Sequence, residues 1–394
     1  MALSMKGLAK EEELVSLLSD MVRIESVNTL FGKGGSDEKN MVEYICRWFD
    51  QYEIPYVLQE TVLPGRFNVL AHIKGSGAGA LCFEAHTDTV SVDEMTIDPF
   101  EPVVKNGKLY GRGSEDDKGS VAVMMYVLKL LKEHNITPQC DIYFCAAADE
   151  EFSYKGVLRL LEDKIPFDAA IVGEGTSCHI VRACMGNVRF KIVTRGVQAH
   201  SSHPWYGRNA IVAMGDVIHE LKEKLLPMYE QRKHPVLGSP TFVMSVIKGG
   251  KQVNFVPEYC EVQVDRRTLP GETFEDVRRE VEDCLKDLLE RNPEYVVEIQ
   301  EPFASDYSME VPEEAQIVRA AAAACDAILG SHEIEGGHYS CDATKFPLVG
   351  IPAIVMGPGN IRKAHTNDEY VEIADLVNLA EVFAQICVDF RPEK

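Results

Sequence analysis

The stretch CDIYFCAAADEE (residues 140–151) indicates the fold class of this chain. Its first nine residues form a nearly continuous apolar run, which is typical of a strand covered on both faces in an α/β sheet. The run ends abruptly in three adjacent acids, Asp149, Glu150 and Glu151. Adjacent carboxylates repel one another, and burial increases the repulsion. We therefore expect a positive counter-charge where this strand ends.

Outward from this stretch, helical and strand patterns alternate up to about residue 180. Apolar residues recur at helical spacing in 13–24, 40–52 and 118–135, and short apolar runs at 67–73, 79–86 and 168–174 predict strands. After about residue 303 the same alternation resumes, with a helical pattern at 315–330 and a strand pattern at 350–359. These segments together predict an α/β domain with a mixed sheet.

The order of elements changes between about 186 and 302. There the patterns read strand, helix, strand, strand, helix, strand, which is the β-α-β-β-α-β order of a ferredoxin-like domain. We therefore predict one α/β domain formed by residues 1–185 and 303–394, interrupted by an inserted domain at 186–302.

Composition excludes several classes of partner. The chain of 394 residues has a net charge of −22, which disfavours binding to nucleic acid or to an anionic membrane. No apolar run approaches the roughly 20 residues of a membrane span, and the first residues lack the apolar core of a secretory signal. Eleven cysteines without a C-x-x-C motif favour buried thiols in a reducing cytoplasm.

Acids and histidines follow several of the predicted strands. They are His86, Asp88, Glu150, Glu151, Glu174 and His365, and Asp116 lies in a Gly-rich turn before a predicted helix. In open α/β sheets ligands bind at the carboxyl ends of the strands, so these side chains are expected to face one crevice. Two imidazoles with several carboxylates are typical ligands of divalent metals, which would supply the counter-charge.

Each of these features has a simpler explanation when taken alone. H-x-D after a strand is often incidental, a double Glu at a helix start is often a solvated pair, and D-x-K-G is often a turn. Their coincidence at consecutive strand ends favours the metal site.

Six strings in the sequence carry a resemblance to a known family. They are HTDTV (86–90), DPFEPVVKNGKLYGRGSEDDKG (98–119), ADEE (148–151), GEGT (173–176), GVQAHSSHPWYGRNAI (196–211) and MGPG…AHTNDEY (356–370). With them the chain resembles the M20 family of co-catalytic zinc amidohydrolases and peptidases. The likeness is strongest to the acetylornithine deacetylase and succinyl-diaminopimelate desuccinylase group.

The resemblance implies a di-metal catalytic domain and assigns its ligands. Asp116 would bridge two divalent ions. His86 and Glu174 would complete the ligands of one ion, and Glu151 and His365 those of the other. The ligand types suit zinc best, and cobalt or manganese also fit.

The same resemblance assigns roles to neighbouring acids. Glu150 would be the general base, and Asp88 would accept a hydrogen bond from the ring of His86 and fix its tautomer. Asp117 stands where the family often has Met and is expected to be an acid at a helix N-terminus. Glu115 is expected to be solvated.

The inserted domain matches the dimerisation, or lid, domain of the family, so we expect a homodimer. His200 would reach the partner's site and stabilise a tetrahedral oxyanion. Asn254 and Arg267 resemble residues that hold the substrate, because an Arg fork binds a carboxylate with two hydrogen bonds. Arg266 is the alternative, since strand alternation sends the two arginines to opposite faces.

These features predict hydrolysis of an amide bond, with an N-acyl amino acid as the substrate of a deacylase. A dipeptidase or carboxypeptidase would use the same metals on a short peptide. A non-enzymatic metal-binding protein would have no use for a base such as Glu150. Departures from the closest group at Gly175 (often Pro), in MTIDPF (no Trp) and in 336–346 leave the metal site intact but bear on the substrate.

Overall fold

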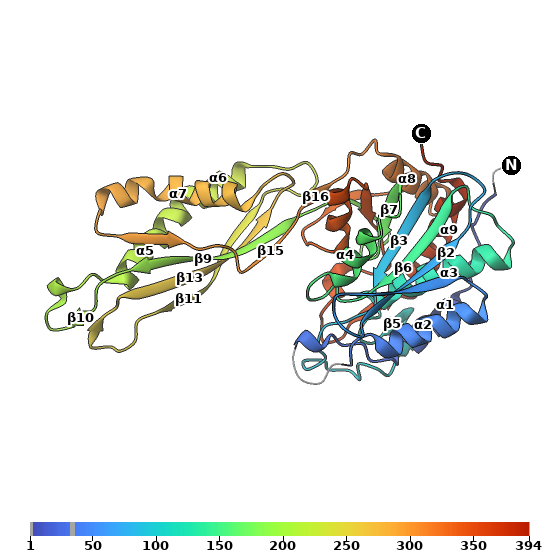
Figure 1. Cartoon of the computed structure of the whole chain (residues 1–394), viewed down its shortest axis with the longest axis horizontal. Helices are drawn as coiled ribbons and strands as arrows, with labels where there is room; N and C mark the ends of the chain where they lie inside the picture. Colours follow the sequence, from blue (N-terminus) through green and yellow to red (C-terminus); the bar gives the residue numbers. More distant parts are fainter. Residues whose placement is uncertain (1–2, 32–35, 394) are drawn as a thin grey trace. The chain divides into compact units, whose positions relative to one another are not determined.

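The computed structural model describes residues 3–31 and 36–393 and divides the chain into two compact units (Figure 1). The first unit comprises Met1–Arg182, Val311–Glu335 and Cys341–Lys394, and the second comprises Ala183–Glu310 and Gly336–Ser340. The second unit thus includes the whole segment 186–302 in which the order of elements was expected to change.

The first unit is an α/β structure built on a mixed sheet. Its strands are β1 (Tyr56–Glu60), β2 (Phe67–Ile73), β3 (Ala80–His86), β6 (Asp141–Ala147), β7 (Ala169–Val172), β18 (Ala353–Val355) and β8 (Ile180–Cys184), whose last two residues belong to the second unit. They run in the order β1-β2-β6-β3-β7-β18-β8. Neighbours from β6 to β18 are parallel, whereas β1, β2 and β8 pair antiparallel to their neighbours. The predicted mixed α/β sheet is therefore confirmed.

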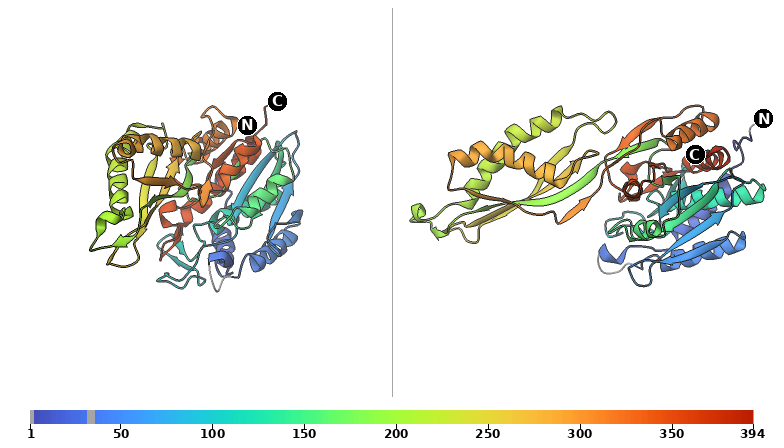
Figure 2. Two further views of the ribbon diagram at one scale, coloured as in Figure 1. Left: turned by 60° about the vertical axis from the view of Figure 1, so that its left-hand side comes forward. Right: turned by 45° about the horizontal axis from the view of Figure 1, so that its top comes forward.

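Helices cover this sheet. They are α1 (Glu11–Val22), α2 (Lys39–Gln51), α3 (Lys118–Glu133), α4 (Lys155–Glu162), α8 (Gln316–Ile328) and α9 (Ile373–Asp389). Alternate residues of β3, namely Leu81, Phe83 and Ala85, join one apolar cluster with α1, α2, α3, α8 and α9. Helix α3 is buried along residues 118–131, as its apolar sequence requires, and it contacts α1, α9 and β3 (Figure 2). A smaller sheet joins β4 (Val103–Lys105), β5 (Lys108–Tyr110) and β19 (Tyr370–Glu372).

The second unit has its own sheet and its own core. Its sheet runs β11 (Thr241–Gly249), β13 (Tyr259–Thr268), β9 (Gly186–Arg195) and β14 (Val296–Ile299), with each neighbouring pair antiparallel. β15 (Ala304–Asp306) also pairs with β9. Helices α5 (Ala210–Glu220), α6 (Leu226–Gln231) and α7 (Phe274–Arg291) pack on it around a separate apolar cluster. β10 (Ala199–His200) and β12 (Phe255–Val256) form a two-stranded sheet.

Two expectations from composition were that no segment spans a membrane and that the cysteines are buried thiols. Within the described residues, every helix is too short or too polar to cross a membrane. All eleven cysteines are free thiols, and ten of them are buried.

Candidate metal centre

The parallel strands bring the predicted ligands to one edge of the sheet. β3 ends at His86, and the chain after β6 carries Glu150 and Glu151. Glu174 follows β7, and the loop after β18 carries His365. Because these four strands are parallel neighbours, their carboxyl ends lie at the same edge.

Asp116 lies between the two histidines. Its Oδ1 is 3.0 Å from Nε2 of His86, and its Oδ2 is 3.1 Å from Nε2 of His365. Nε2 of His365 is also 3.2 Å from Oε2 of Glu151. Each oxygen of one carboxylate thus faces a different imidazole, which is the arrangement that a carboxylate bridging two ions requires.

Two groups of ligand atoms gather around His86. One contains His86, Asp116 and Glu151, and the other contains His86, Glu150 and Glu174; within each group the atoms lie within 4.8 Å of one another. The structure therefore brings together all five predicted ligands and the predicted base.

The electrostatics of this edge favour a bound cation. Burial raises the pKa of Glu151 to about 7, and raises the pKa values of Glu150 and Glu174 well above the ordinary range of a glutamate. Hydrogen bonds to Asp116 and Glu151 raise the pKa of His365 to about 11. Burial, together with the neighbouring carboxylates, thus favours the protonated forms of these glutamates, and metal binding would displace their protons. The residues present fit a pair of divalent ions.

Asp88 contacts Nδ1 of His86, the ring nitrogen that does not face Asp116. Nδ1 of His86 lies 3.0 Å from the backbone oxygen of Asp88 and 3.4 Å from its carboxylate Oδ1. The nearer acceptor is thus the backbone oxygen rather than the expected carboxylate. A proton on Nδ1 leaves Nε2 free to act as a ligand.

The loop that carries Asp116 is held by a residue that the sequence analysis did not single out. Oε1 of Glu369 accepts hydrogen bonds from the backbone N–H groups of Glu115, at 3.0 Å, and Asp116, at 3.1 Å. Its Oε2 accepts a hydrogen bond of 2.7 Å from Arg112, and both side chains are buried. Glu369 belongs to AHTNDEY, so the family string contained a signal for it.

The expectation that Glu115 is solvated was wrong. Its side chain is fully buried, and its Oε1 lies so close to Gly175 that a Cβ added there would be only 1.5 Å away. Glycine at position 175 therefore leaves the space that Glu115 fills. Asp117 precedes α3 at its N-cap, as expected, but it is also buried, which raises its pKa to about 8.

Three further predicted residues lie in the second unit. His200 is exposed on β10, and Ser201 beside it donates a backbone hydrogen bond of 3.0 Å to the carbonyl oxygen of Asn254. Arg267 on β13 is partly exposed and donates to Asp265, whereas Arg266 is fully buried. The roles predicted for His200, Asn254 and Arg267 stay predictions.

Known proteins resemble this chain in sequence and in fold. An acetylornithine deacetylase of Buchnera aphidicola subsp. Schizaphis graminum (strain Sg) is 28% identical over 386 residues, which cover 97% of this chain and 99% of that protein. The structure of the aminopeptidase PepT from Bacillus cereus matches with a TM-score of 0.79 at 20% identity, over 97% of this chain and 99% of that one.

A further structural match is the Bacillus subtilis YXEP protein, described as a dinuclear metal binding peptidase from the M20 family. Its TM-score is 0.72 at 17% identity, over 96% of this chain and 97% of that one. The model of peptidase family M20/M25/M40 matches residues 82–389, from β3 to the end of α9. The chain therefore belongs to peptidase family M20/M25/M40.

Proposed function

We propose that this chain hydrolyses the amide bond of an N-acyl amino acid, with Glu150 as the general base. The observation that carries the proposal is the position of Asp116 between two imidazoles, with Glu150 within 4.8 Å of His86 and Glu174. The similarity to an acetylornithine deacetylase along nearly the whole chain supports deacylation.

The proposed ligands would hold two divalent ions, with zinc as the first candidate. Asp116 would bridge them, His86 and Glu174 would serve one, and Glu151 and His365 the other. When bound, such ions lower the pKa of a shared water and polarise a carbonyl oxygen. Glu150 would accept the proton of the attacking water and then return it to the leaving nitrogen.

We further propose that the second unit is a ferredoxin-like dimerisation domain. β11 ends its sheet, and it exposes Val243 and Ile247. An unpaired edge strand with apolar side chains can pair with its copy about a two-fold axis. In that dimer His200 would stabilise the oxyanion in the partner's site, and Asn254 and Arg267 would hold the substrate. We also propose that this chain is located in the cytoplasm.

A peptidase acting on short peptides is the second candidate. It would share the metal ligands and Glu150 and would differ in the pocket for the substrate. Gly175 and the segment 336–346 depart from the deacetylase group, and these departures favour keeping this candidate.

An assay with a small panel of substrates tests the function. N-acetyl and N-succinyl amino acids and dipeptides are offered to the purified protein after loading with zinc, cobalt or manganese. We expect turnover of an N-acyl amino acid, two ions per chain by metal analysis, and loss of turnover on chelation. Preferred cleavage of dipeptides would replace the deacylase by the peptidase. An active chain that holds only one ion at saturation would contradict the di-metal site.

A further inference from the structure

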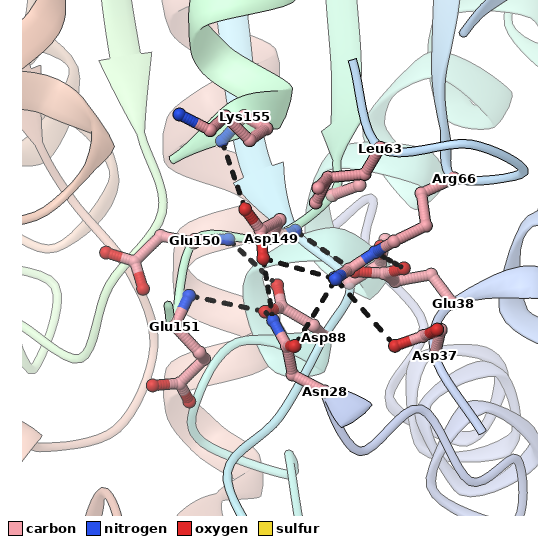
Figure 3. A network of polar contacts seen from close by, with 12 residues as sticks. Asn28, Asp37, Glu38, Leu63, Arg66, Asp88, Asp149, Glu150, Glu151 and Lys155 are labelled. Atoms are coloured by element: carbon pink, nitrogen blue, oxygen red, sulfur yellow. Dashed lines mark hydrogen bonds and ion pairs between the residues drawn. The ribbon is translucent and has the colours of Figure 1, made fainter. Parts of the chain in front are cut away.

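Arg66, just before β2, is the centre of a buried polar network behind the metal centre (Figure 3). Its Nε donates a hydrogen bond of 2.8 Å to Oε2 of Glu38, and its Nη2 donates to the other oxygen of the same carboxylate. Its Nη1 lies 3.2 Å from Oδ1 of Asp149 and 3.3 Å from Oδ1 of Asn28. The same Nη1 also lies 3.7 Å from Oδ1 of Asp37, so the planar fork of one guanidinium serves four side chains.

Asn28 and Glu38 connect Arg66 to the segment that bears the base. Nδ2 of Asn28 donates to Oδ1 of Asp149, at 3.0 Å, and to Oδ2 of Asp88, at 2.8 Å. Oε1 of Glu38 accepts a hydrogen bond of 3.0 Å from the backbone N–H of Asp149. Asp149 is therefore held through both its backbone and its carboxylate.

Asp149 needs this support because of its backbone conformation. Its φ is +65°, in the left-handed region that a residue with a side chain seldom adopts. Such a conformation persists where the surroundings over-determine it. Hydrogen bonds from Tyr154 N to the carbonyl oxygen, at 2.6 Å, and from the hydroxyl of Ser153 to the carboxylate complete the turn.

The turn at Asp149 sets the direction of the two glutamates after it. The backbone N–H groups of Glu150 and Glu151 donate to the carboxylate of Asp88 at 3.1 and 3.3 Å. Figure 3 shows their carboxylates pointing away from the network, on the side opposite Arg66. The backbone is thus fixed on one side while the carboxylates are presented on the other.

We propose that Arg66 is a positioning residue for the reaction: through Asp149 and the Asn28–Asp88 link it holds the turn that aims Glu150. The inference rests on the proposed function in one respect, that Glu150 is the general base. Arg66 itself touches none of the metal ligands or the base. Its effect on turnover must therefore pass through the geometry of residues 149–151.

The first experiment compares Arg66→Met and Arg66→Lys with a matched control. Lys129→Met removes a buried cation of α3, which pairs with Glu13 and lies outside the network. We expect Arg66→Met to lower kcat by about 10–100-fold, as for other residues that orient functional groups, with little change in KM or metal content. Arg66→Lys keeps the charge but loses the fork, so an intermediate kcat is expected, and Lys129→Met should leave kcat unchanged.

Hydrogen exchange gives a readout that does not depend on activity. We expect Arg66→Met to speed amide exchange in the peptide that covers residues 147–155, while exchange in α9 stays as in the parent protein. If Arg66→Met does not fold, Asn28→Ala removes the link to Asp88 while leaving the Arg66–Glu38 pair, and the same exchange and kinetic effects are expected. Unchanged exchange in 147–155 in the folded variants would overturn the proposal.

A double-mutant cycle tests whether Arg66 acts through Glu150. Glu150→Asp shortens the side chain by one methylene and moves its carboxylate back. In that variant kcat should depend less on how the turn at residues 149–151 orients the carboxylate. Arg66→Met should then lower kcat by a much smaller factor in the Glu150→Asp background than in the parent protein. Equal losses in both backgrounds would overturn the proposal. If Glu150→Asp and Glu150→Gln both keep full activity, the proposed base is wrong, whereas the exchange experiment still reports on Arg66 and the turn.

Discussion

The edge of the first unit that carries the ligands and the β10–β12 sheet of the second unit differ in burial. At the first, His86 and Asp116 are only 2% and 6% exposed, and their polar atoms face other members of the site. At the second, His200 is exposed, and the nearby Trp205 and Tyr206 are 69% and 74% exposed. Most of the first region is enclosed by its own unit, although His365 is 54% exposed, whereas the second region presents its side chains outward.

This difference separates two kinds of functional residue. All five proposed ligands and Glu150 belong to the first unit. Nδ1 of His200 contacts Ser202, its neighbour in sequence, at 2.7 Å. A catalytic role for His200 therefore requires a surface outside its own unit, which is the basis of the proposed dimer.

The largest effect is expected from Glu150→Gln in the enclosed region. Glutamine keeps the size of the side chain but cannot accept a proton, so kcat should fall about 10²–10⁴-fold or more. Metal analysis should still find two ions per chain, because Glu150 is not one of the proposed ligands. Near-normal turnover with full metal content would remove Glu150 as the base.

A smaller loss is expected from His200→Ala in the exposed region. Removing one oxyanion donor typically lowers kcat about 10²–10³-fold, and metal content should not change. Co-expression of Glu150→Gln chains with His200→Ala chains then tests whether His200 acts in trans. A heterodimer would have one site with both defects and one with neither, so activity should partly return. Isolated heterodimers without recovered activity would exclude the trans role.

Most of the proposed ligands could be predicted because they follow a short apolar run. One strand ends in His86 and another ends just before Glu150. The end of a strand alone places such a residue at the carboxyl edge of the sheet, and the arrangement of the helices does not change this. Family strings then separated Asp116 from its acidic neighbours. The order of the elements in the sequence likewise predicted the α/β sheet.

The Arg66 network could not be predicted in the same way. Asn28, Glu38, Arg66 and Asp149 are far apart in the sequence, and none of them lies in a periodic pattern that would indicate burial. Glu115 was placed in solvent because a charged residue in a turn is usually exposed. Its burial depends on space at Gly175, which no local pattern reveals.

Gly175→Ala tests how tightly the enclosed region is packed. The new Cβ would lie 1.5 Å from Oε1 of Glu115 and 2.8 Å from the backbone N of Ile361, so one of them must move. We expect the free energy of unfolding to fall by about 1–3 kcal/mol, as for other overpacked sites. Chemical denaturation measures it, and Glu115→Ala should relieve part of the loss. An equal loss with and without Glu115 would show that this carboxylate does not fill the space.

The smallest effect is expected from the matched change Gly215→Ala in the second unit. Gly215 is exposed in the interior of α5, and apart from its own helix backbone and chain neighbours no described residue lies within 4 Å of an added Cβ. Alanine is the better helix former, so the free energy of unfolding should rise by about 0.5–1 kcal/mol in the same denaturation experiment. A decrease would mean that α5 is covered in solution. If sedimentation then found the variant shifted toward the monomer, α5 would be part of the dimer interface, and the outward-facing region would be enclosed by the second chain.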